Sequence, residues 1–195
     1  MKKHILTLFL LLAFTAYTTA QSNTGSTPKY VFYFIGDGMG MNQVNGTETY
    51  LAAKEGRIGI KPLCFGDFPH TAFATTFSSS HGITDSAAAG SALANGNKTY
   101  NSCIGLLPDS VTAVSSIAVW AKEAGAAVGI TTSVSVDHAT PAAFYAHRKN
   151  RNMYYEIGQD MYRSGFDFLP AATFSSQNAP AKHRCTNRHR MPATP

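Results

Sequence analysis

The feature that most constrains the fold is an apolar run at 30–35, "YVFYFI", which ends at the glycines of "GDGMG". Aromatic and β-branched residues without polar alternation are typical of a strand buried on both faces of a parallel sheet. Two further strands are predicted at 71–78 and 126–136, the second of them also buried. Helical patterns lie between and after these strands, at 41–56, 84–95, 109–125 and 152–164. Strands alternating with helices predict an α/β fold with parallel strands.

Local signals predict where two of these helices begin and end. Asp85 or Thr84 is expected to cap the second helix, because a short polar side chain accepts hydrogen bonds from the free N–H groups of the first turn. Gly96 is expected to end it, since glycine adopts the left-handed conformation that stops a helix. Asp109 or Ser110 is expected to begin the third helix.

Residues 1–20 have the pattern of a secretory signal peptide. Lys2 and Lys3 precede an apolar run at 5–14, and small residues lead to Ala20. An N-terminal membrane anchor is the alternative, and it is disfavoured because the run is too short to span a bilayer comfortably. We therefore expect export to the periplasm or the extracellular space, with no membrane attachment after cleavage.

The remaining chain is predicted to form three parts. A polar linker at 21–29 leads into the α/β part at 30–168. The segment 169–195 is rich in basic residues and proline and lacks hydrophobic periodicity, so it is expected to be a disordered tail or sequence foreign to this fold.

The formal net charge of +5 does not indicate a nucleic-acid partner. Between residues 21 and 176 there are ten basic and eleven acidic residues, so the excess positive charge belongs to the two ends. The three cysteines, Cys64, Cys103 and Cys185, have no metal-binding spacing. In an exported protein Cys64 and Cys103 could form a disulfide, although their spacing does not require one.

Asp37 follows the first predicted strand, at the sheet edge where ligands of open α/β folds bind. A dinucleotide loop is excluded, because the third glycine of the fingerprint is replaced by Met41. A carboxylate held rigidly at a strand end suits a hard metal cation, whereas a turn aspartate bonded to its own backbone is the structural alternative. The residues alone do not favour the metal ligand over the turn aspartate, or the reverse.

Ser86 lies at the predicted start of the helix in "HGITDSAAAGSALANG". The free N–H groups and positive dipole end of a helix N-terminus attract phosphate, and a serine there is a candidate nucleophile if a metal activates it. No oriented histidine base is evident. Taken alone, the segment favours plain helix capping.

The segment "DHATPAAFYAHRKNR" at 137–151 follows the other buried strand. It can present Asp137, His138 and Thr140 at the same sheet edge, a mixture of nitrogen and oxygen ligands that suits a divalent cation. Arg151 is a candidate for bidentate binding of phosphate. The alternative is a solvated basic turn.

Together, "FIGDGMG", "TDSAAAGSALANG" and "TTSVSVDHATPAAFYAHRKNR" resemble the N-terminal half of the alkaline phosphatases in order and spacing. The similarity runs from about Tyr30 to about Phe168 and implies a three-layer αβα core with a parallel sheet, incomplete in this chain. It also implies hydrolysis of phosphate monoesters, two zinc ions and one magnesium ion per intact site, and a homodimer in intact relatives.

The resemblance assigns roles to the candidate residues. Ser86 would be phosphorylated and then dephosphorylated by a zinc-activated water. Arg151 would clamp the phosphate, with Asp85 helping to position it. The metal ligands would be Asp37, bridging a zinc and the magnesium, Thr140 on the magnesium side, and His138, where family members carry either Asp or His.

Family members are much longer, and their remaining zinc ligands have no counterpart in this sequence. We therefore expect little or no turnover from the chain, and a frameshift or truncated reading after residue 168 would explain the change in character there. Family-like sequence in another frame past that codon would support this reading. The alternatives are a non-catalytic secreted fragment or pseudogene product, or another metal-dependent hydrolase of the same superfamily.

Overall fold

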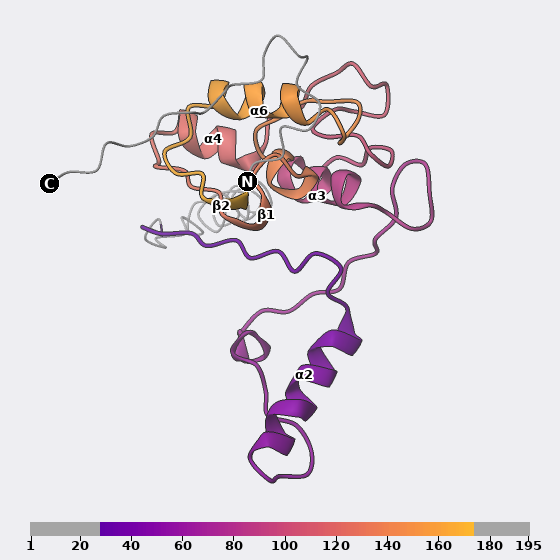
Figure 1. The fold of residues 1–195 in the computed structure, drawn as a ribbon, viewed down its shortest axis with the longest axis vertical. Coiled ribbons are helices and arrows are strands. Elements are labelled where there is room, and N and C mark those ends of the chain that lie inside the picture. Colours follow the sequence, from indigo (N-terminus) through magenta and orange to yellow (C-terminus); the bar gives the residue numbers. More distant parts are fainter. Residues whose placement is uncertain (1–27, 174–195) are drawn as a thin grey trace, which may run out of the picture. The chain divides into compact units, whose positions relative to one another are not determined.

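The computed structural model describes residues 28–173, which fall into two units, 28–36 and 37–173. The predicted signal peptide and most of the predicted linker and tail lie outside the described residues. Along the chain (Figure 1) the elements are α2 (Met41–Lys54), η1 (Cys64–Asp67), α3 (Ser86–Asn95), α4 (Ile117–Glu123), β1 (Thr132–Ser135), α5 (Ala139–Ala142), α6 (Tyr154–Arg163) and β2 (Ala171–Thr173). No helix among the described residues is long and apolar enough to cross a membrane.

The first unit is irregular throughout 28–36, so the buried strand predicted at 30–35 is wrong. Phe32 and Phe34 are 78% and 86% exposed, and their rings stack with 6.5 Å between centroids. The strand predicted at 71–78 is also wrong, and Phe73 is 99% exposed. An apolar pattern expresses a preference for burial, but a strand exists only where a neighbour takes up its backbone hydrogen bonds.

The helix predicted at 41–56 is confirmed as α2, which ends at Lys54. The side-chain Oε1 of Gln43 accepts the backbone N–H of Gly40 at 2.9 Å and so satisfies a donor at the start of the helix. After the helix the chain folds back along it, and the backbone N–H of Leu63 donates to Oε1 of Glu48, in the helix, at 3.0 Å.

The helix predicted at 84–95 is confirmed as α3, with both predicted end signals in use. Asp85 caps it by accepting the backbone N–H of Ala88 at 3.0 Å, and Gly96 ends it in the left-handed conformation. Its small residues allow a close approach to α5: a Cβ on Gly90 would lie only 3.2 Å from the Cβ of Ala143. The run of alanine, glycine and serine is therefore explained by packing as well as by helix propensity.

The helix predicted at 109–125 is only partly formed. Helix α4 begins at Ile117, where Ser116 accepts the backbone N–H of Val119 at 3.2 Å. Upstream, Asp109 accepts the N–H groups of Val111 and Thr112 at 2.9 and 2.8 Å. The prediction failed there because Asp109 stabilises a local turn instead of a helix start.

The sheet of the described residues consists of two parallel strands, β1 and β2, which lie side by side in Figure 1. The strand predicted at 126–136 is confirmed only over Thr132–Ser135, and its side chains are half-buried or exposed rather than buried. Its partner β2 lies within the predicted tail, so at least Ala171–Thr173 belongs to the α/β structure. Two strands do not make the predicted three-layer core.

The helix predicted at 152–164 is confirmed as α6. Its Ile157 is fully buried together with Cys103, Ile104 and Ala142, which are 0% exposed. The Arg148 guanidinium pairs with the Asp160 carboxylate of α6 at 2.5 Å. Cys64 is exposed and Cys103 is buried, and both are free thiols, so they do not form a disulfide.

Glycine is required more strongly at Gly105 than at Gly96, although both have positive φ angles of 62° and 76°. A Cβ on Gly105 would lie 2.3 Å from the carbonyl oxygen of Ala146, whereas a Cβ on Gly96 would meet nothing within 4 Å. We expect Gly105→Ala to lower the free energy of unfolding by about 2–4 kcal/mol, and Gly96→Ala by only about 1 kcal/mol. Urea unfolding followed by circular dichroism measures both. Equal losses in the two variants would contradict the assigned packing at Gly105.

Candidate active site

Ser86 is the first residue of α3, where the backbone N–H groups of the first turn have no partners within the helix. Its Oγ donates a hydrogen bond to Oδ1 of Asp37 at 3.2 Å. The two residues are 49 positions apart in the sequence. A hydroxyl bonded to a carboxylate at a helix N-terminus is oriented and lies in a field that favours negative charge.

Asp37 also binds the third motif. Its Oδ2 accepts a hydrogen bond at 2.9 Å from the hydroxyl of Thr140, which lies in α5, 103 residues further along the chain. Each oxygen of this exposed carboxylate thus accepts a hydrogen bond from one hydroxyl. The structure brings together three of the predicted residues from three separate motifs.

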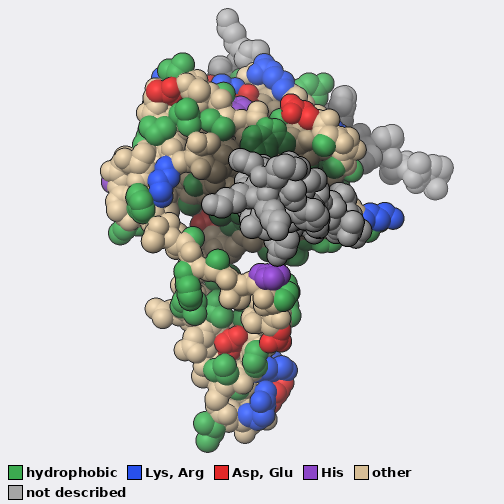
Figure 2. Space-filling model, turned by 180° about the vertical axis from the view of Figure 1, so that it is seen from behind, with side chains coloured by type: hydrophobic (Ala, Val, Ile, Leu, Met, Phe, Trp, Pro, Cys, Tyr) green, Lys and Arg blue, Asp and Glu red, His purple; other side chains and the backbone are tan. Residues whose placement is uncertain are grey.

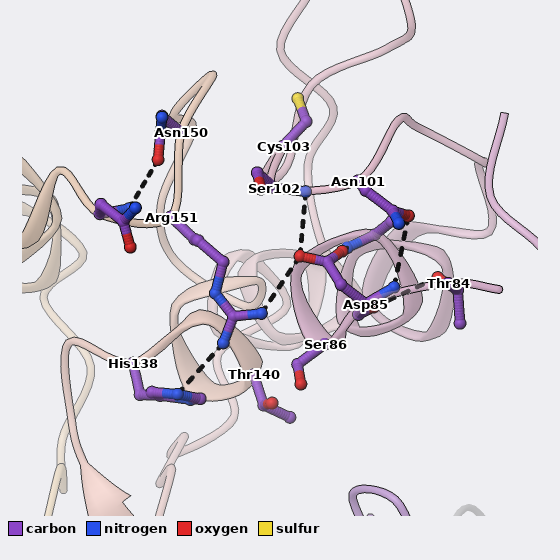
Figure 3. A network of polar contacts seen from close by, with 12 residues as sticks. Thr84, Asp85, Ser86, Asn101, Ser102, Cys103, His138, Thr140, Asn150 and Arg151 are labelled. Atoms are coloured by element: carbon purple, nitrogen blue, oxygen red, sulfur yellow. Dashed lines mark hydrogen bonds and ion pairs between the residues drawn. The ribbon is translucent and has the colours of Figure 1, made fainter. Parts of the chain in front are cut away.

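The other three form a second network around Arg151 (Figure 3). Nη1 of Arg151 donates to Oδ2 of Asp85 at 3.1 Å, and Nη2 lies 3.1 Å from Nε2 of His138. Both members of the Asp85–Arg151 ion pair are 22% exposed. The pair is partly shielded from water, so its geometry is held more firmly than that of a surface ion pair.

The protonation of His138 follows from its neighbours. A guanidinium group carries donors only, so Nε2 of His138 accepts from Arg151 and the ring proton of the neutral form sits on Nδ1. That Nδ1 is buried and has no hydrogen-bond partner. Burial lowers the pKa of His138, the charge of Arg151 lowers it further, and Asp37 and Asp137 oppose the shift. The ring is therefore neutral at neutral pH.

Comparison with known proteins identifies the family of the chain. A family model described as alkaline phosphatase matches residues 28–169. This chain belongs to the alkaline phosphatase family.

Curated members are similar over most of the chain. Alkaline phosphatase 4 of Drosophila melanogaster is 34% identical over 132 residues, which are 63% of this chain and 22% of that protein. The alkaline phosphatase of Schizosaccharomyces pombe is 35% identical over 168 residues, 78% of this chain and 31% of that protein. The chain thus spans less than a third of the length of these relatives.

Solved alkaline phosphatases share its fold. The enzyme of the Antarctic bacterium TAB5 has a TM-score of 0.61 and 37% identity, and covers 69% of this chain and 37% of its own. A cold-active enzyme from Shewanella sp. has a TM-score of 0.63 and 33% identity, over 69% and 34% of the two chains. The chain therefore has an alkaline-phosphatase-like α/β fold, and the three-layer core is not seen in the described part.

The described residues fit one hard cation better than a complete alkaline phosphatase metal site. Asp37, Ser86 and Thr140 bring a carboxylate and two hydroxyls together, the oxygen ligands that magnesium prefers. His138 offers no free lone pair in this arrangement, since Nε2 accepts from Arg151 and Nδ1 carries the proton. Within 28–173 no group of three or more His, Cys, Asp or Glu side chains could hold a metal ion.

Sequence reasoning missed two residues that hold the second network. The backbone N–H of Ser102 donates to Oδ2 of Asp85 at 3.0 Å, and the side chain of Asn101 accepts the backbone N–H of Asp85 at 3.3 Å. These contacts come from a turn with no motif of its own. The ring of His81, the nearest histidine to Ser86 in sequence, contacts Ser80 at 2.7 Å.

In the metal-free chain, Arg151→Met should raise the pKa of His138 toward its ordinary value, because the guanidinium charge is one of the causes that lower it. Arg151→Lys keeps a positive charge and should leave the pKa low. NMR titration of the His138 ring protons measures both variants. An unchanged pKa in Arg151→Met would contradict the assigned role of the charge.

The same shift makes stability depend on pH. Because the pKa of His138 is lowered in the folded chain, its neutral ring contributes stability that is complete above the ordinary histidine pKa and is lost as the pH falls below it. Arg151→Met should narrow the pH range over which this loss occurs. Thermal unfolding between neutral and mildly acidic pH measures the effect, and Arg163→Met, at an exposed arginine, is the control.

Proposed function

We propose that this chain hydrolyses phosphate monoesters through a phosphoserine formed on Ser86. The observation that carries the proposal is the placement of the Ser86 hydroxyl at the N-terminus of α3, bonded to Asp37, with the ion-paired Arg151 held from the same helix end by Asp85. Membership of the alkaline phosphatase family and the relatives' printed names support it.

In this proposal the chain's own groups bind and orient the phosphate. The free N–H groups at the start of α3 attract the anion, and Arg151 offers guanidinium donors to its oxygens. Asp85 keeps Arg151 in place through one oxygen while its other oxygen caps the helix. Neutral His138 accepts from the far side of the guanidinium, so it adds no charge that would compete for the phosphate.

The reaction then runs in two displacements. Ser86 Oγ, oriented by Asp37, gives up its proton to solvent water and attacks phosphorus. The bond from phosphorus to the ester oxygen breaks, and the leaving alkoxide takes a proton back from solvent water to depart as the alcohol. Water next attacks the phosphoserine, releasing inorganic phosphate and restoring the Ser86 hydroxyl. Arg151 and the α3 N-terminus offset the negative charge of the transferring phosphoryl group in both steps.

We also propose that Asp37 and Thr140 would hold a magnesium ion, and that Asp37 would also be a ligand of one of two zinc ions in the intact site. Metal bound there would supply positive charge that lowers the pKa of the serine hydroxyl and of the attacking water. Histidine-to-aspartate and histidine-to-glutamate variants of the TAB5 enzyme are described with Mg bound in the M3 site, which supports a magnesium position of this kind.

The wider setting belongs to the proposal as well. A complete three-layer αβα core would bury the apolar segments 30–35 and 71–78, in which most side chains are exposed in the described chain. The signal-peptide pattern at 1–20 supports export to the periplasm or the extracellular space. A homodimer is proposed from the family alone.

Covalent labelling of Ser86 tests the function. We expect the purified chain, incubated with p-nitrophenyl phosphate, Zn²⁺ and Mg²⁺, to gain one phosphate group on Ser86, detected by mass spectrometry of its peptides. Ser86→Ala should abolish the label, and Ser115→Ala, at an exposed serine outside the site, should not.

Steady turnover should be low, because no group of three or more His, Cys, Asp or Glu side chains that could hold a metal is assembled in 28–173. Zinc bound per chain is measured on the same samples. No label on the unsubstituted chain, together with near-zero zinc, would overturn the proposal and favour a non-catalytic secreted protein. A label that persists in Ser86→Ala would exclude Ser86 as the nucleophile.

A further inference from the structure

We infer that Asn101, in the turn 100–103, is a positioning residue for the nucleophile and the phosphate-binding arginine. The inference rests on the proposed function of Ser86 and Arg151 and adds the element that holds both. The turn is closed by the backbone N–H of Cys103, which donates to the carbonyl of Tyr100 at 3.1 Å. It lies directly over the start of α3 and beside Arg151 (Figure 3).

The Asn101 side chain binds the residues just before Ser86. Its Oδ1 accepts the backbone N–H of Asp85 at 3.3 Å, and its Nδ2 donates to the carbonyl of Ile83 at 3.1 Å. One amide thus holds two backbone groups of the segment that leads into α3. Because Ser86 follows Asp85 directly, this contact limits where the Ser86 hydroxyl can lie.

The backbone of the next residue, Ser102, binds both members of the ion pair. The N–H of Ser102 donates to Oδ2 of Asp85 at 3.0 Å, and its carbonyl accepts the backbone N–H of Arg151 at 2.8 Å. Ser102 has φ of 74°, in the left-handed region that is uncommon for residues with a Cβ. The bonds from Asn101 and Ser102 hold the turn in this conformation, as expected where backbone strain accompanies a site.

The turn is anchored to the segment that carries Arg151. Cys103 and Ile104 are fully buried, and Ile104 and Arg148 exchange backbone hydrogen bonds of 2.7 and 2.9 Å. A shift of the turn is therefore resisted on one side by the core and on the other by Asp85. Asn101 is the side chain through which this rigidity reaches the helix end, so its loss should affect Asp85, Arg151 and Ser86 together.

The test compares two variants of the full chain. Asn101→Ala removes both side-chain bonds, and Asn97→Ala removes an exposed amide that donates to the carbonyl of Asn95, at the far end of α3. Inorganic phosphate affinity is measured in the presence of Mg²⁺, and the Nε–Hε NMR signal of Arg151, assigned with Arg151→Lys, is recorded well below the unfolding temperature.

We expect Asn101→Ala to weaken phosphate binding about tenfold, as for the loss of a hydrogen bond in a charged network, and to shift the Arg151 signal. Asn97→Ala should change neither. If Asn101→Ala does not fold, Asn101→Ser replaces it, because a serine hydroxyl is too short to join Asp85 to Ile83.

The two proposals fail in different ways. If the unsubstituted chain binds no phosphate, the proposed function is in error, and the Arg151 signal still reports on Asn101. A folded Asn101 variant with an unchanged Arg151 signal overturns the positioning role, whatever the phosphate affinity. A shift of equal size in Asn97→Ala also overturns it, since the effect would then not be specific to this turn.

Discussion

The carboxylate of Asp85 is the group on which the arrangement of this site depends, because each of its oxygens joins different parts of the chain. Oδ1 accepts from the backbone of Ala88 and so starts α3. Oδ2 accepts from Ser102 and from the guanidinium of Arg151. The same residue therefore decides where the helix begins and where the arginine lies, and the two cannot move independently. An anion entering the site meets the helix N-terminus and the arginine in a fixed relation.

The small residues of α3 make the second half of the site possible. With glycine at position 90, the helix lies close enough to α5 for Thr140 to reach the carboxylate that also receives Ser86. Larger residues on this face would separate the helices and move Thr140 away from Asp37. The packing of a helix pair thus controls a potential ligand set for a hard cation.

The exposed apolar side chains show what the described residues leave unburied. Tyr30, Phe68 and Ile58 are among the large hydrophobic residues with most of their surface accessible, and hydrophobic side chains are scattered over the face shown in Figure 2. The first strand-like segment and 71–78 have the composition of sheet interiors, yet neither is a strand. Such a composition favours burial in a sheet, but a strand forms only where neighbouring strands pair with it.

Local sequence determined the elements whose stabilising contacts are local. Helix α3 could be predicted with its ends because Asp85 and Gly96 act within one turn of them, and the helix predicted at 152–164 is α6. The same kind of evidence failed at Asp109, because its carboxylate accepts backbone N–H groups of a local turn instead of capping a helix. The six candidate site residues were named from their motifs together with the family resemblance that those motifs carry.

Only the tertiary structure decided how those residues meet. Both oxygens of Asp37 accept hydrogen bonds from hydroxyls that lie 49 and 103 residues further along the chain. His138 turns its accepting nitrogen to Arg151, and Asn101 and Ser102 hold the ion pair. All of these contacts join residues that are distant in sequence. Strands belong to the same class, since β1 exists where β2 pairs with it and 30–35 remains irregular. Hydrogen bonds between distant residues carry no local signature, so the sequence named the groups and the fold set their geometry.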